Sequence, residues 1–412
     1  MEKEREENFA NRIDEFLNFL DRNLVSKFPE PLRTSIRSKI NELREIIMET
    51  REPRFAIVGR RGAGKSSLIN AIFGSKVADV GHVKAMTGIG KWYLYEDKKG
   101  RMSILDTRGL GEGSKPDEKA QEKSSEEEVK ASIDKECPDA LLFLCKAKEI
   151  DARIDADIKS LAEIKSYIQK KHKYDPPIVG IITQVDELDP PDTVKPPYEN
   201  SEKQKHIALA TALLSQKMKT NFGDIVKVIP TSAYIRFENG KIARDRRWNI
   251  DKLVEYLIEI IPRSAQIELA RIGRIKSVQK KMARIIIGSA ATIAGGIGAE
   301  PIPVADLPFI TGIQIGMIIG IGYISGKKMN KKTAVEFMSA MGLNVGAAFA
   351  FRQLAQSLIK LIPVAGPFIS GAIAFAATWA IGEAAIAFFI DKKSAKEAKK
   401  TYKKEQEKKQ RE

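Results

Sequence analysis

The sequence has few residues of the types that build metal centres and disulfide scaffolds. Among its 412 residues there are two cysteines, Cys137 and Cys145, and three histidines, His82, His172 and His206. Two thiols exclude a disulfide framework and a multi-cysteine metal cluster, and three widely separated histidines make a histidine-rich metal centre improbable. Aromatic residues make up 7% of the chain, which leaves little for stacking nucleic-acid bases.

The amino-terminal residues also lack the apolar core of a secretion signal. They read MEKEREENFANR, so we expect the N-terminal part of the chain to stay in the cytoplasm. The formal net charge is +15, and residues 392–412 hold ten Lys or Arg against four Asp or Glu, which is +6. Such a tail favours an anionic partner, a phospholipid surface or a nucleic acid, although a solvated helix that aids solubility has the same composition.

Four zones follow one another along the chain. Residues 1–52 carry apolar side chains at steps of three and four, which predicts amphipathic helices. In residues 53–262, short apolar runs alternate with helical stretches, which is typical of a mostly parallel sheet with helices on both faces. Residues 263–390 are poor in charge and rich in Gly and Ala, and residues 391–412 form the basic tail. The strands are expected at residues 55–58, 92–95, 102–105, 140–145, 178–183 and 225–229.

We therefore expect an α/β domain together with an all-α helical region, formed by the N-terminal helices and an apolar C-terminal domain. Residues 285–299 and 337–351 are each uncharged and belong to this apolar domain.

A phosphate-binding sequence follows the first expected strand. Residues 59–66, GRRGAGKS, fit the pattern GxxxxGK[ST] between a strand and an apolar helix. Backbone N–H groups of such a loop point inward at an anion, and the helix N-terminus adds its partial positive charge. Lys65 is then expected to contact the β- and γ-phosphates, and the Ser66 hydroxyl to bind Mg²⁺. The predicted phosphate-binding set is Gly59, Arg60, Arg61, Gly62, Ala63, Gly64, Lys65, Ser66 and Ser67.

Two further sequences supply candidates for binding the metal ion and the γ-phosphate. Asp106 begins the sequence DTRG at the end of an expected strand. Its carboxylate would hold Mg²⁺ through water, and the Gly109 N–H would sense the γ-phosphate. Thr87, the only threonine between the phosphate loop and Asp106, would complete the Mg²⁺ shell when the γ-phosphate is present. An ordinary loop hydroxyl is the alternative for Thr87, and a surface histidine is the alternative for the nearby His82.

A purine-reading sequence, TQVD, begins at Thr183 at the end of the fifth expected strand. Its Asp186 would accept hydrogen bonds from N1–H and the exocyclic amine of guanine, which adenine does not offer in that arrangement. The backbone of Ser232 and Ala233 would contact O6 of the base from the end of the next strand. Each sequence alone is a weak signal, but their order, each at the end of a strand, predicts a guanine-nucleotide site.

Together, GRRGAGKS, Thr87, DTRG, TQVD and the SA at residues 232–233 resemble the TRAFAC-class GTPases. The run GRRGAGKSSLINAIFG looks most like their Era, dynamin and immunity-related GTPase branch. The resemblance spans residues 53–262 and implies a P-loop G domain that binds GTP and GDP with Mg²⁺. The roles that it implies are phosphate binding by Gly59, Gly64 and Lys65, Mg²⁺ binding by Ser66 and Thr87, γ-phosphate sensing by Gly109, and guanine reading by Asp186 with Ser232 and Ala233 behind the base.

The sequence departs from these relatives at two positions. Gln184 stands where they usually have a lysine whose stem lies over the purine, so we expect guanine preference to persist with weaker binding. Leu110 stands where many have a glutamine that orients the attacking water, so we expect slow intrinsic hydrolysis. Relatives with an apolar residue there commonly supply the missing group from elsewhere, often across a dimer. Candidates for stabilising charge are Arg60, Arg61 and Arg108, and a structural or solvent-facing role is the alternative for each.

The apolar zone contains runs long enough to suggest a membrane. Residues 307–326 and 361–382 are uncharged for 20 and 22 residues, above the roughly 18 that mark a candidate spanning helix. The stretch that begins GAEPIPVADLP at residue 298 resembles a membrane-associated bacterial domain family of the YcjF type. A cytoplasmic G domain and a cytoplasmic basic tail would require an even number of crossings. A soluble helical bundle is the alternative, because prolines and glycines interrupt both runs.

These observations predict a nucleotide switch that hydrolyses GTP to GDP and phosphate with Mg²⁺, coupled to membrane association or self-assembly. The predicted catalytic residues are Lys65, Thr87, Gly109 and Arg61, and the predicted metal ligands are Ser66, Thr87 and Asp106. One alternative is a non-catalytic GTP-binding membrane scaffold, which Leu110 favours. The other is a ribosome- or RNA-assembly GTPase, which the positive charge favours although no RNA-binding module is recognisable, so a nucleic-acid partner is not expected.

Overall fold

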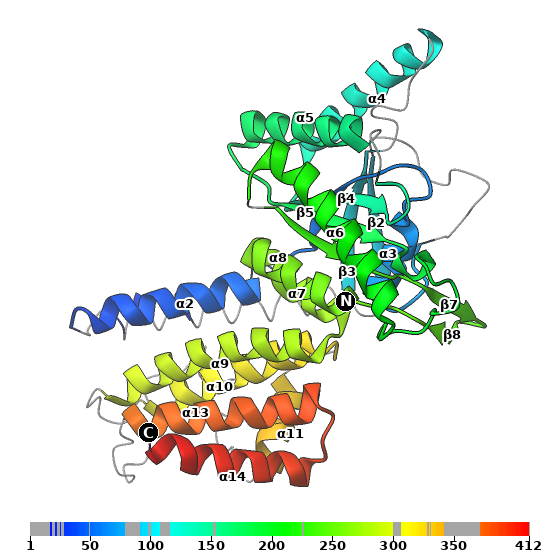
Figure 1. Cartoon of the computed structure of the whole chain (residues 1–412). Helices are drawn as coiled ribbons and strands as arrows, with labels where there is room; N and C mark the ends of the chain where they lie inside the picture. Colours follow the sequence, from blue (N-terminus) through cyan, green and yellow to red (C-terminus); the bar gives the residue numbers. More distant parts are fainter. Residues whose placement is uncertain are drawn as a thin grey trace. The chain divides into compact units, whose positions relative to one another are not determined.

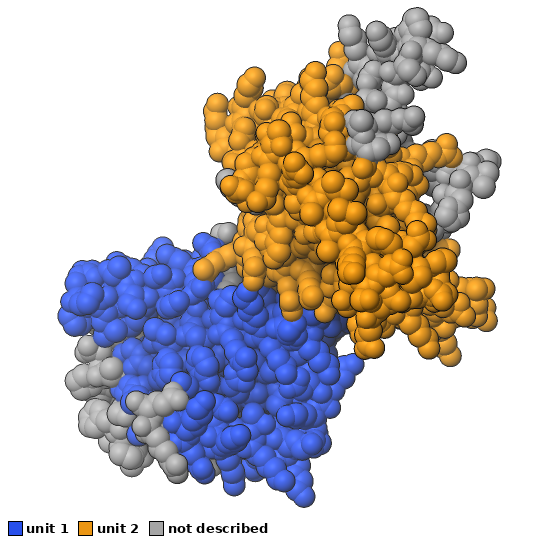
Figure 2. All heavy atoms as spheres, viewed as in Figure 1, with its two compact units in different colours: residues 1–50, 274–412 blue, residues 51–273 orange. Residues whose placement is uncertain are grey.

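A computed structural model of the chain describes residues 17–18, 21–22, 25, 29–48, 50–78, 91–97, 100–107, 116–150, 154–224, 226–299, 306–327, 329, 331–341 and 371–411. The chain divides into two compact units (Figure 2). Unit 2 comprises Arg51–Gly273, and unit 1 comprises Met1–Thr50 together with Arg274–Glu412. Unit 2 is therefore inserted, in sequence, into unit 1.

Unit 2 is built on a six-stranded sheet with the order β2-β3-β1-β4-β5-β6. Figure 1 labels β2, β3, β4 and β5 of this sheet. β2 runs antiparallel to β3, and every other neighbouring pair is parallel. The carboxyl ends of the parallel strands consequently lie at one edge of the sheet, where the sequence places its chemically distinctive residues. The strands are β1 (Arg54–Val58), β2 (Lys91–Asp97), β3 (Gly100–Asp106), β4 (Ala140–Lys146), β5 (Ile178–Thr183) and β6 (Lys227–Pro230).

Helices cover both faces of this sheet. Along β4, Leu141, Phe143 and Cys145 share one hydrophobic core with α4 (Pro116–Lys135), α5 (Ile154–His172) and α6 (Ser201–Phe222). Leu142 and Leu144 are equally buried, and they point to the opposite face because successive strand side chains alternate. The remaining helices of unit 2 pack together. α3 (Lys65–Phe73) contacts α7 (Ile250–Ile260) and α8 (Arg263–Gly273), and α8 also contacts β3. The expectation of a mostly parallel sheet with helices on both faces is confirmed.

A small hairpin extends unit 2 beyond this expectation. β7 (Ile235–Glu238) and β8 (Lys241–Asp245) pair antiparallel, and Asn239 and Gly240 between them have φ angles of 50° and 72°. Two consecutive left-handed residues are what a tight hairpin turn needs, and Asn-Gly supplies them at low cost. The strand expected at residues 225–229 begins at Lys227 instead.

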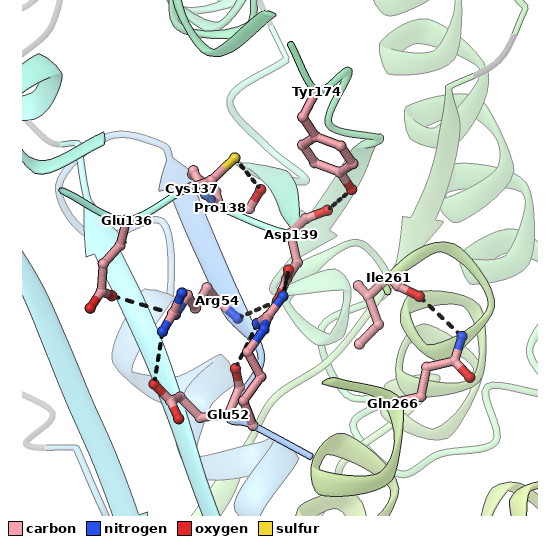
Figure 3. Close-up of polar contacts among 10 residues, drawn as sticks. Glu52, Arg54, Glu136, Cys137, Pro138, Asp139, Tyr174, Ile261 and Gln266 are labelled. Carbon is pink, nitrogen blue, oxygen red and sulfur yellow. Dashed lines mark hydrogen bonds and ion pairs between the residues drawn. The ribbon is translucent and has the colours of Figure 1, made fainter. Parts of the chain in front are cut away.

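The edge of the sheet opposite the strands' carboxyl ends is anchored by one buried carboxylate, Asp139 (Figure 3). Asp139 accepts hydrogen bonds from both terminal nitrogens of Arg51, at 2.9 and 2.5 Å, and from the backbone N–H of Arg54 at 2.9 Å. The Tyr174 hydroxyl donates to the Asp139 carbonyl at 2.9 Å. The residue that precedes β4 thereby fixes the stretch of chain that enters β1.

Unit 1 is helical, which confirms the expected helical region. α9 (Lys276–Ala299) packs against α2 (Leu32–Met48), α10 (Asp306–Ile324) and α13 (Gly371–Ala385), and α13 packs against α14 (Ala395–Arg411). α11 (Lys331–Ala340) lies against α10, and the π-helical turn η4 (Ile386–Ile390) continues α13. α9 and α13 approach closely at Gly382, where a Cβ atom would lie 2.4 Å from the Ile287 side chain. Only glycine allows this approach.

The apolar runs of the sequence fall mainly on α10 and α13. Among the described residues, one helical stretch, Gly371–Ile390, is long and apolar enough to cross a membrane, and 67% of an 18-residue window within it is buried. The apolar part of α10 is shorter. Gln314, which interrupts the first run, is buried and donates a hydrogen bond to the Thr378 hydroxyl at 3.1 Å. Residues 342–370, which include the first ten of the 22 residues of the second run, lie outside the described residues.

Candidate functional site

The phosphate loop lies between β1 and α3, as its sequence predicts. Gly62 and Gly64 have φ angles of 80° and 89°, a left-handed conformation that side chains with a Cβ atom rarely adopt. At Gly59 the limit is space, because a Cβ atom there would lie 2.7 Å from the carbonyl oxygen of Leu144 on β4. The glycines of the motif therefore allow the loop to turn tightly against the sheet and lead into the N-terminus of α3, where anions bind.

Lys65, the first residue of α3, lies across this loop. Its ammonium donates a hydrogen bond to the Gly59 carbonyl at 2.7 Å and is 3.6 Å from the Asp106 carboxylate at the end of β3. Lys65 and Asp106 are both largely buried. The partly buried Ser66 follows on the first turn of α3. The structure thus brings together a cation, a hydroxyl and a carboxylate beside the loop.

This donor set suits a Mg²⁺ ion that also binds phosphate oxygens. The described residues contain no group of three His, Cys, Asp or Glu that would hold a metal ion alone. Mg²⁺ usually keeps several waters and takes one or two protein oxygens together with phosphate oxygens. The Ser66 hydroxyl and the Asp106 carboxylate are oxygens of that kind.

The TQVD segment contacts the phosphate loop directly. The buried Thr183 hydroxyl donates to the Ala63 carbonyl at 2.9 Å, and the Gln184 amide donates to the Gly62 carbonyl at 3.0 Å. Gln184 has a φ of 57°, so the chain turns sharply after β5 and carries its side chain over the loop. Two residues from the end of β5 therefore hold a loop that lies 120 or more positions earlier in the sequence.

Asp186 lies in the 3-10 turn η2 (Val185–Glu187) that follows β5. Within the described part of the chain, no group donates a hydrogen bond to the partly exposed Asp186 carboxylate. β6 ends beside this turn, because the Thr231 N–H donates to the Ile182 carbonyl at 2.7 Å. The next two residues, Ser232 and Ala233, are buried. The two segments expected to read a base therefore lie next to each other.

The arginines of the loop differ in their surroundings. The Arg60 guanidinium forms an ion pair with Asp157 on α5, with 2.8 Å between Nε and Oδ2. Asp157 is largely buried, so this pair ties the loop to α5. Arg61 is exposed on the loop.

Several predicted residues of the two switch-type segments lie outside the described residues. They are His82, Thr87, Arg108, Gly109 and Leu110.

One buried cation near Asp186 was not predicted from the sequence. Lys203, in the first turn of α6, is fully buried, and its ammonium donates to the carbonyls of Asp186 at 2.7 Å and Leu188 at 2.9 Å. Burial lowers the pKa of Lys203, while the Asp186 carboxylate acts against this shift. Burial likewise raises the pKa of Tyr198, whose ring lies 5.2 Å from the Lys203 ammonium. The sequence does carry one sign that Lys203 is buried, because Lys203 falls on the same helix face as the apolar residues of α6.

Among the comparisons of the whole chain with known proteins, the family-model match includes the phosphate loop and Asp106. Residues 54–184, from β1 to Gln184, match the family model described as 50S ribosome-binding GTPase. Over 245 residues the chain is 26% identical to the uncharacterized protein YfjP of Escherichia coli (strain K12), covering 59% of this chain and 72% of that protein.

Two further likenesses are to a curated protein and to a solved structure. The chain is 23% identical over 263 residues to the GTPase Era of Xanthomonas oryzae pv. oryzae (strain MAFF 311018), covering 60% of this chain and 83% of that protein. Among solved structures, Toc33 from Arabidopsis thaliana in complex with Mg²⁺ and GMPPNP has 16% identity and a TM-score of 0.36, covering 57% of this chain and 94% of that chain.

Proposed function

We propose that this chain, whose residues 54–184 match a GTPase family model, is a P-loop GTPase of the TRAFAC type that binds GTP with Mg²⁺ and hydrolyses it slowly to GDP and phosphate. The backbone of residues 59–66 and the Lys65 ammonium would hold the triphosphate. Ser66 and Asp106 would bind the metal ion, joined by Thr87 when the γ-phosphate is present. When bound, Mg²⁺ would neutralise charge that develops between the β- and γ-phosphates.

One observation carries this proposal, namely the pair of hydrogen bonds from Thr183 and Gln184 to the carbonyls of Ala63 and Gly62. A nucleoside triphosphate has an anionic end and a planar base, and one protein must hold both at a fixed separation. The two bonds join a loop suited to the anionic end to a turn suited to the base. Chance resemblance of either segment to a motif would not place them in contact.

Guanine would be selected by the Asp186 carboxylate. Since no described group donates to it, the carboxylate is available to accept N1–H and the exocyclic amine of guanine. Adenine would leave it without those donors, and an unpaired charged acceptor is costly. Gln184 would lie over the purine, and the buried Ser232 and Ala233 would lie behind it.

The central experiment is isothermal titration of the full chain with GTP, ATP and xanthosine triphosphate in the presence of Mg²⁺. We expect GTP to bind best to the wild type, and Asp186→Asn to shift the preference toward xanthosine triphosphate because the amide can donate to the C2 carbonyl of xanthine. Asp192→Asn, at an exposed carboxylate of the same loop, is the matched control. Equal affinity for ATP and GTP, or an unchanged preference in Asp186→Asn, would contradict the guanine assignment.

Slow hydrolysis and self-association belong to the same proposal. Leu110 cannot orient water, so another group, such as Arg61 or a residue of a second copy, would have to stabilise the transition state. Phosphate release per protein molecule should then be low and should rise with protein concentration. Absence of turnover at every concentration would favour a non-catalytic GTP-binding scaffold instead.

Unit 1 would bind an anionic membrane surface and so couple the nucleotide state to membrane association. α14 presents one exposed face of lysines, while Ala398 on its other face is buried and Lys409 lies 5.2 Å from the Trp379 ring of α13. Lysines close to an anionic bilayer each contribute about 1 kcal/mol of attraction. The exposed lysines are Lys396, Lys400, Lys403, Lys404 and Lys408.

A second candidate function comes from the description of the matching family model, which names ribosome binding. The positive net charge is compatible with RNA. Flotation with phosphatidylserine-containing vesicles, compared with neutral vesicles, and pull-down with ribosomal RNA separate the two outputs. Flotation without RNA capture supports the membrane proposal, and RNA capture without flotation supports the second candidate.

A further inference from the structure

Lys203 occupies a position that a lysine rarely takes. Its side chain is fully buried, and it lies in the first turn of α6, where the partial positive charge of a helix disfavours a cation. The helix begins there because the Asn200 side chain accepts the backbone N–H groups of residues 202 and 203. Something other than helix stability has to hold a cation at this place.

The backbone of the loop after β5 holds it. The ammonium donates to the carbonyls of Asp186 at 2.7 Å, Leu188 at 2.9 Å and Pro190 at 3.4 Å. A lysine ammonium has three donors, and three carbonyls of one short loop accept them. The first of these carbonyls belongs to the residue whose carboxylate is proposed to read guanine.

The same lysine is linked to the second base-side segment through two aromatic rings. Its ammonium lies 5.2 Å from the centre of the Tyr198 ring, and that ring meets Trp248 edge-on at 5.3 Å. The backbone of Trp248 pairs with Ser232 through two hydrogen bonds of 3.2 and 2.9 Å. A continuous set of contacts therefore runs from the carbonyl of Asp186 to the backbone of Ser232.

We propose that Lys203 is a positioning residue for purine selection: it fixes the turn that carries Asp186 and, through Tyr198 and Trp248, sets that turn against Ser232. The inference rests on the proposed function, because it concerns how the proposed base site is held. Lys203 does not touch the nucleotide. Its removal would leave the carbonyls of Asp186 and Leu188 without their ammonium donor, while the Pro190 carbonyl would keep the Thr193 N–H, and the turn would shift to recover a donor.

A positioning role has a different signature from a purely structural one. Phosphate contacts are common to all nucleoside triphosphates, so a general loss of stability weakens GTP and ATP binding alike. A displaced Asp186 weakens only the contacts that guanine makes. The ratio of the ATP dissociation constant to the GTP dissociation constant is therefore the informative quantity.

The test is isothermal titration of the full chain with Mg²⁺–GTP and Mg²⁺–ATP for the wild type, Lys203→Met and Lys205→Met. Methionine keeps the length of the side chain without its charge, and Lys205 is an exposed lysine of the same helix turn. We expect Lys203→Met to reduce the ATP-to-GTP ratio by roughly tenfold, the size of one lost charge-assisted hydrogen bond. Lys205→Met should keep the wild-type ratio.

The GTP preference of the wild type tests the proposed function, and the change of the ATP-to-GTP ratio in the variants tests this inference. A wild type without preference for GTP refutes the guanine site itself. A folded Lys203→Met with the wild-type ratio refutes the positioning role while leaving the guanine site intact. If circular dichroism shows that Lys203→Met is unfolded, Tyr198→Leu is titrated instead. Leucine fills most of the buried volume of Tyr198 but loses the ring contact with Trp248. An unchanged ATP-to-GTP ratio in Tyr198→Leu would overturn the proposal.

Discussion

Arg51 and Asp139 form a two-pronged ion pair just before β1 and β4, with hydrogen bonds of 2.9 and 2.5 Å. The Asp139 side chain is 3% exposed and that of Arg51 is 30% exposed. Water therefore has little access to the Asp139 carboxylate and competes weakly for its hydrogen bonds with Arg51. The Asp139 carboxylate, by accepting these hydrogen bonds, raises the pKa of Arg51 above its ordinary value.

Replacing Asp139 by asparagine should lower the free energy of unfolding by about 3 kcal/mol, because one charge of a buried pair is left without its partner. Urea unfolding of the full chain, followed by circular dichroism, measures this. Asp224→Asn, at a carboxylate that is 89% exposed, is the control and should change stability by less than about 0.5 kcal/mol. Equal effects of the two substitutions would contradict the assignment.

Cys137, close to this pair, should make stability fall at high pH. Burial chiefly, with the Asp139 carboxylate second, raises the pKa of Cys137 to about 11 from an ordinary value of 9.0. Between about pH 9 and 11 the unfolded chain loses this proton while the folded chain keeps it, so the free energy of unfolding falls as pH rises. The difference in unfolding free energy between the wild type and Cys137→Ser, measured from pH 8 to 11, isolates this effect. A difference that does not change with pH would refute it.

Gly59→Ala should abolish tight GTP binding. Its Cβ atom would lie 2.7 Å from the Leu144 carbonyl, and relief of that overlap should move the loop and cost about 1–3 kcal/mol of stability. Gly288→Ala in α9 is the control, since nothing lies within 4 Å of its Cβ position and alanine favours a helix by up to about 1 kcal/mol. Titration with GTP and thermal unfolding of both variants test the contrast.

Arg60 and Arg61 should separate into a structural and a catalytic arginine. Arg60→Ala breaks the 2.8 Å pair with Asp157 and should cost about 1 kcal/mol of stability. Arg61→Ala, at an exposed side chain, should cost less stability than Arg60→Ala and should reduce the turnover number. Single-turnover phosphate release and urea unfolding on both variants provide the measurements, and the reverse pattern would exchange the two roles.

Gln184→Ala should weaken GTP binding by roughly three- to tenfold, because it removes the hydrogen bond to Gly62 and the cover over the purine. Gln216→Ala, at an exposed position of α6, is the matched control. An unchanged dissociation constant for GTP in Gln184→Ala would place its side chain away from the base.

Sequence patterns predicted the sheet well because their physical causes are local. Buried parallel strands are short continuous apolar runs, and the glycines of the phosphate loop are required by backbone geometry at those positions. The β7–β8 hairpin escaped prediction although its turn residues, Asn239 and Gly240, carry a strong local signal. Its strands alternate weakly and are largely exposed, so no apolar run marked them.

Lys203 escaped prediction for a different reason. On α6 it falls in phase with the buried residues Ile207, Ala210, Leu214 and Met218, and a lysine in phase with an apolar face is a visible signal. Its acceptors, however, are backbone carbonyls of a loop that precedes the helix. Backbone acceptors leave no residue-type signature, so the sequence could show that the lysine was unusual but not what it holds.

The division of unit 1 into two stretches of sequence has a consequence during synthesis. α2 packs against α9, but the whole of unit 2 is translated between them. At roughly 5–20 residues per second, α2 emerges on the order of ten seconds or more before its partner. Through that interval Ile36, Ile40 and Leu43 have no α9 to cover them, so the nascent chain offers an apolar helix to chaperones while unit 2 is being synthesised, and unit 2 has its complete sequence before α9 is made.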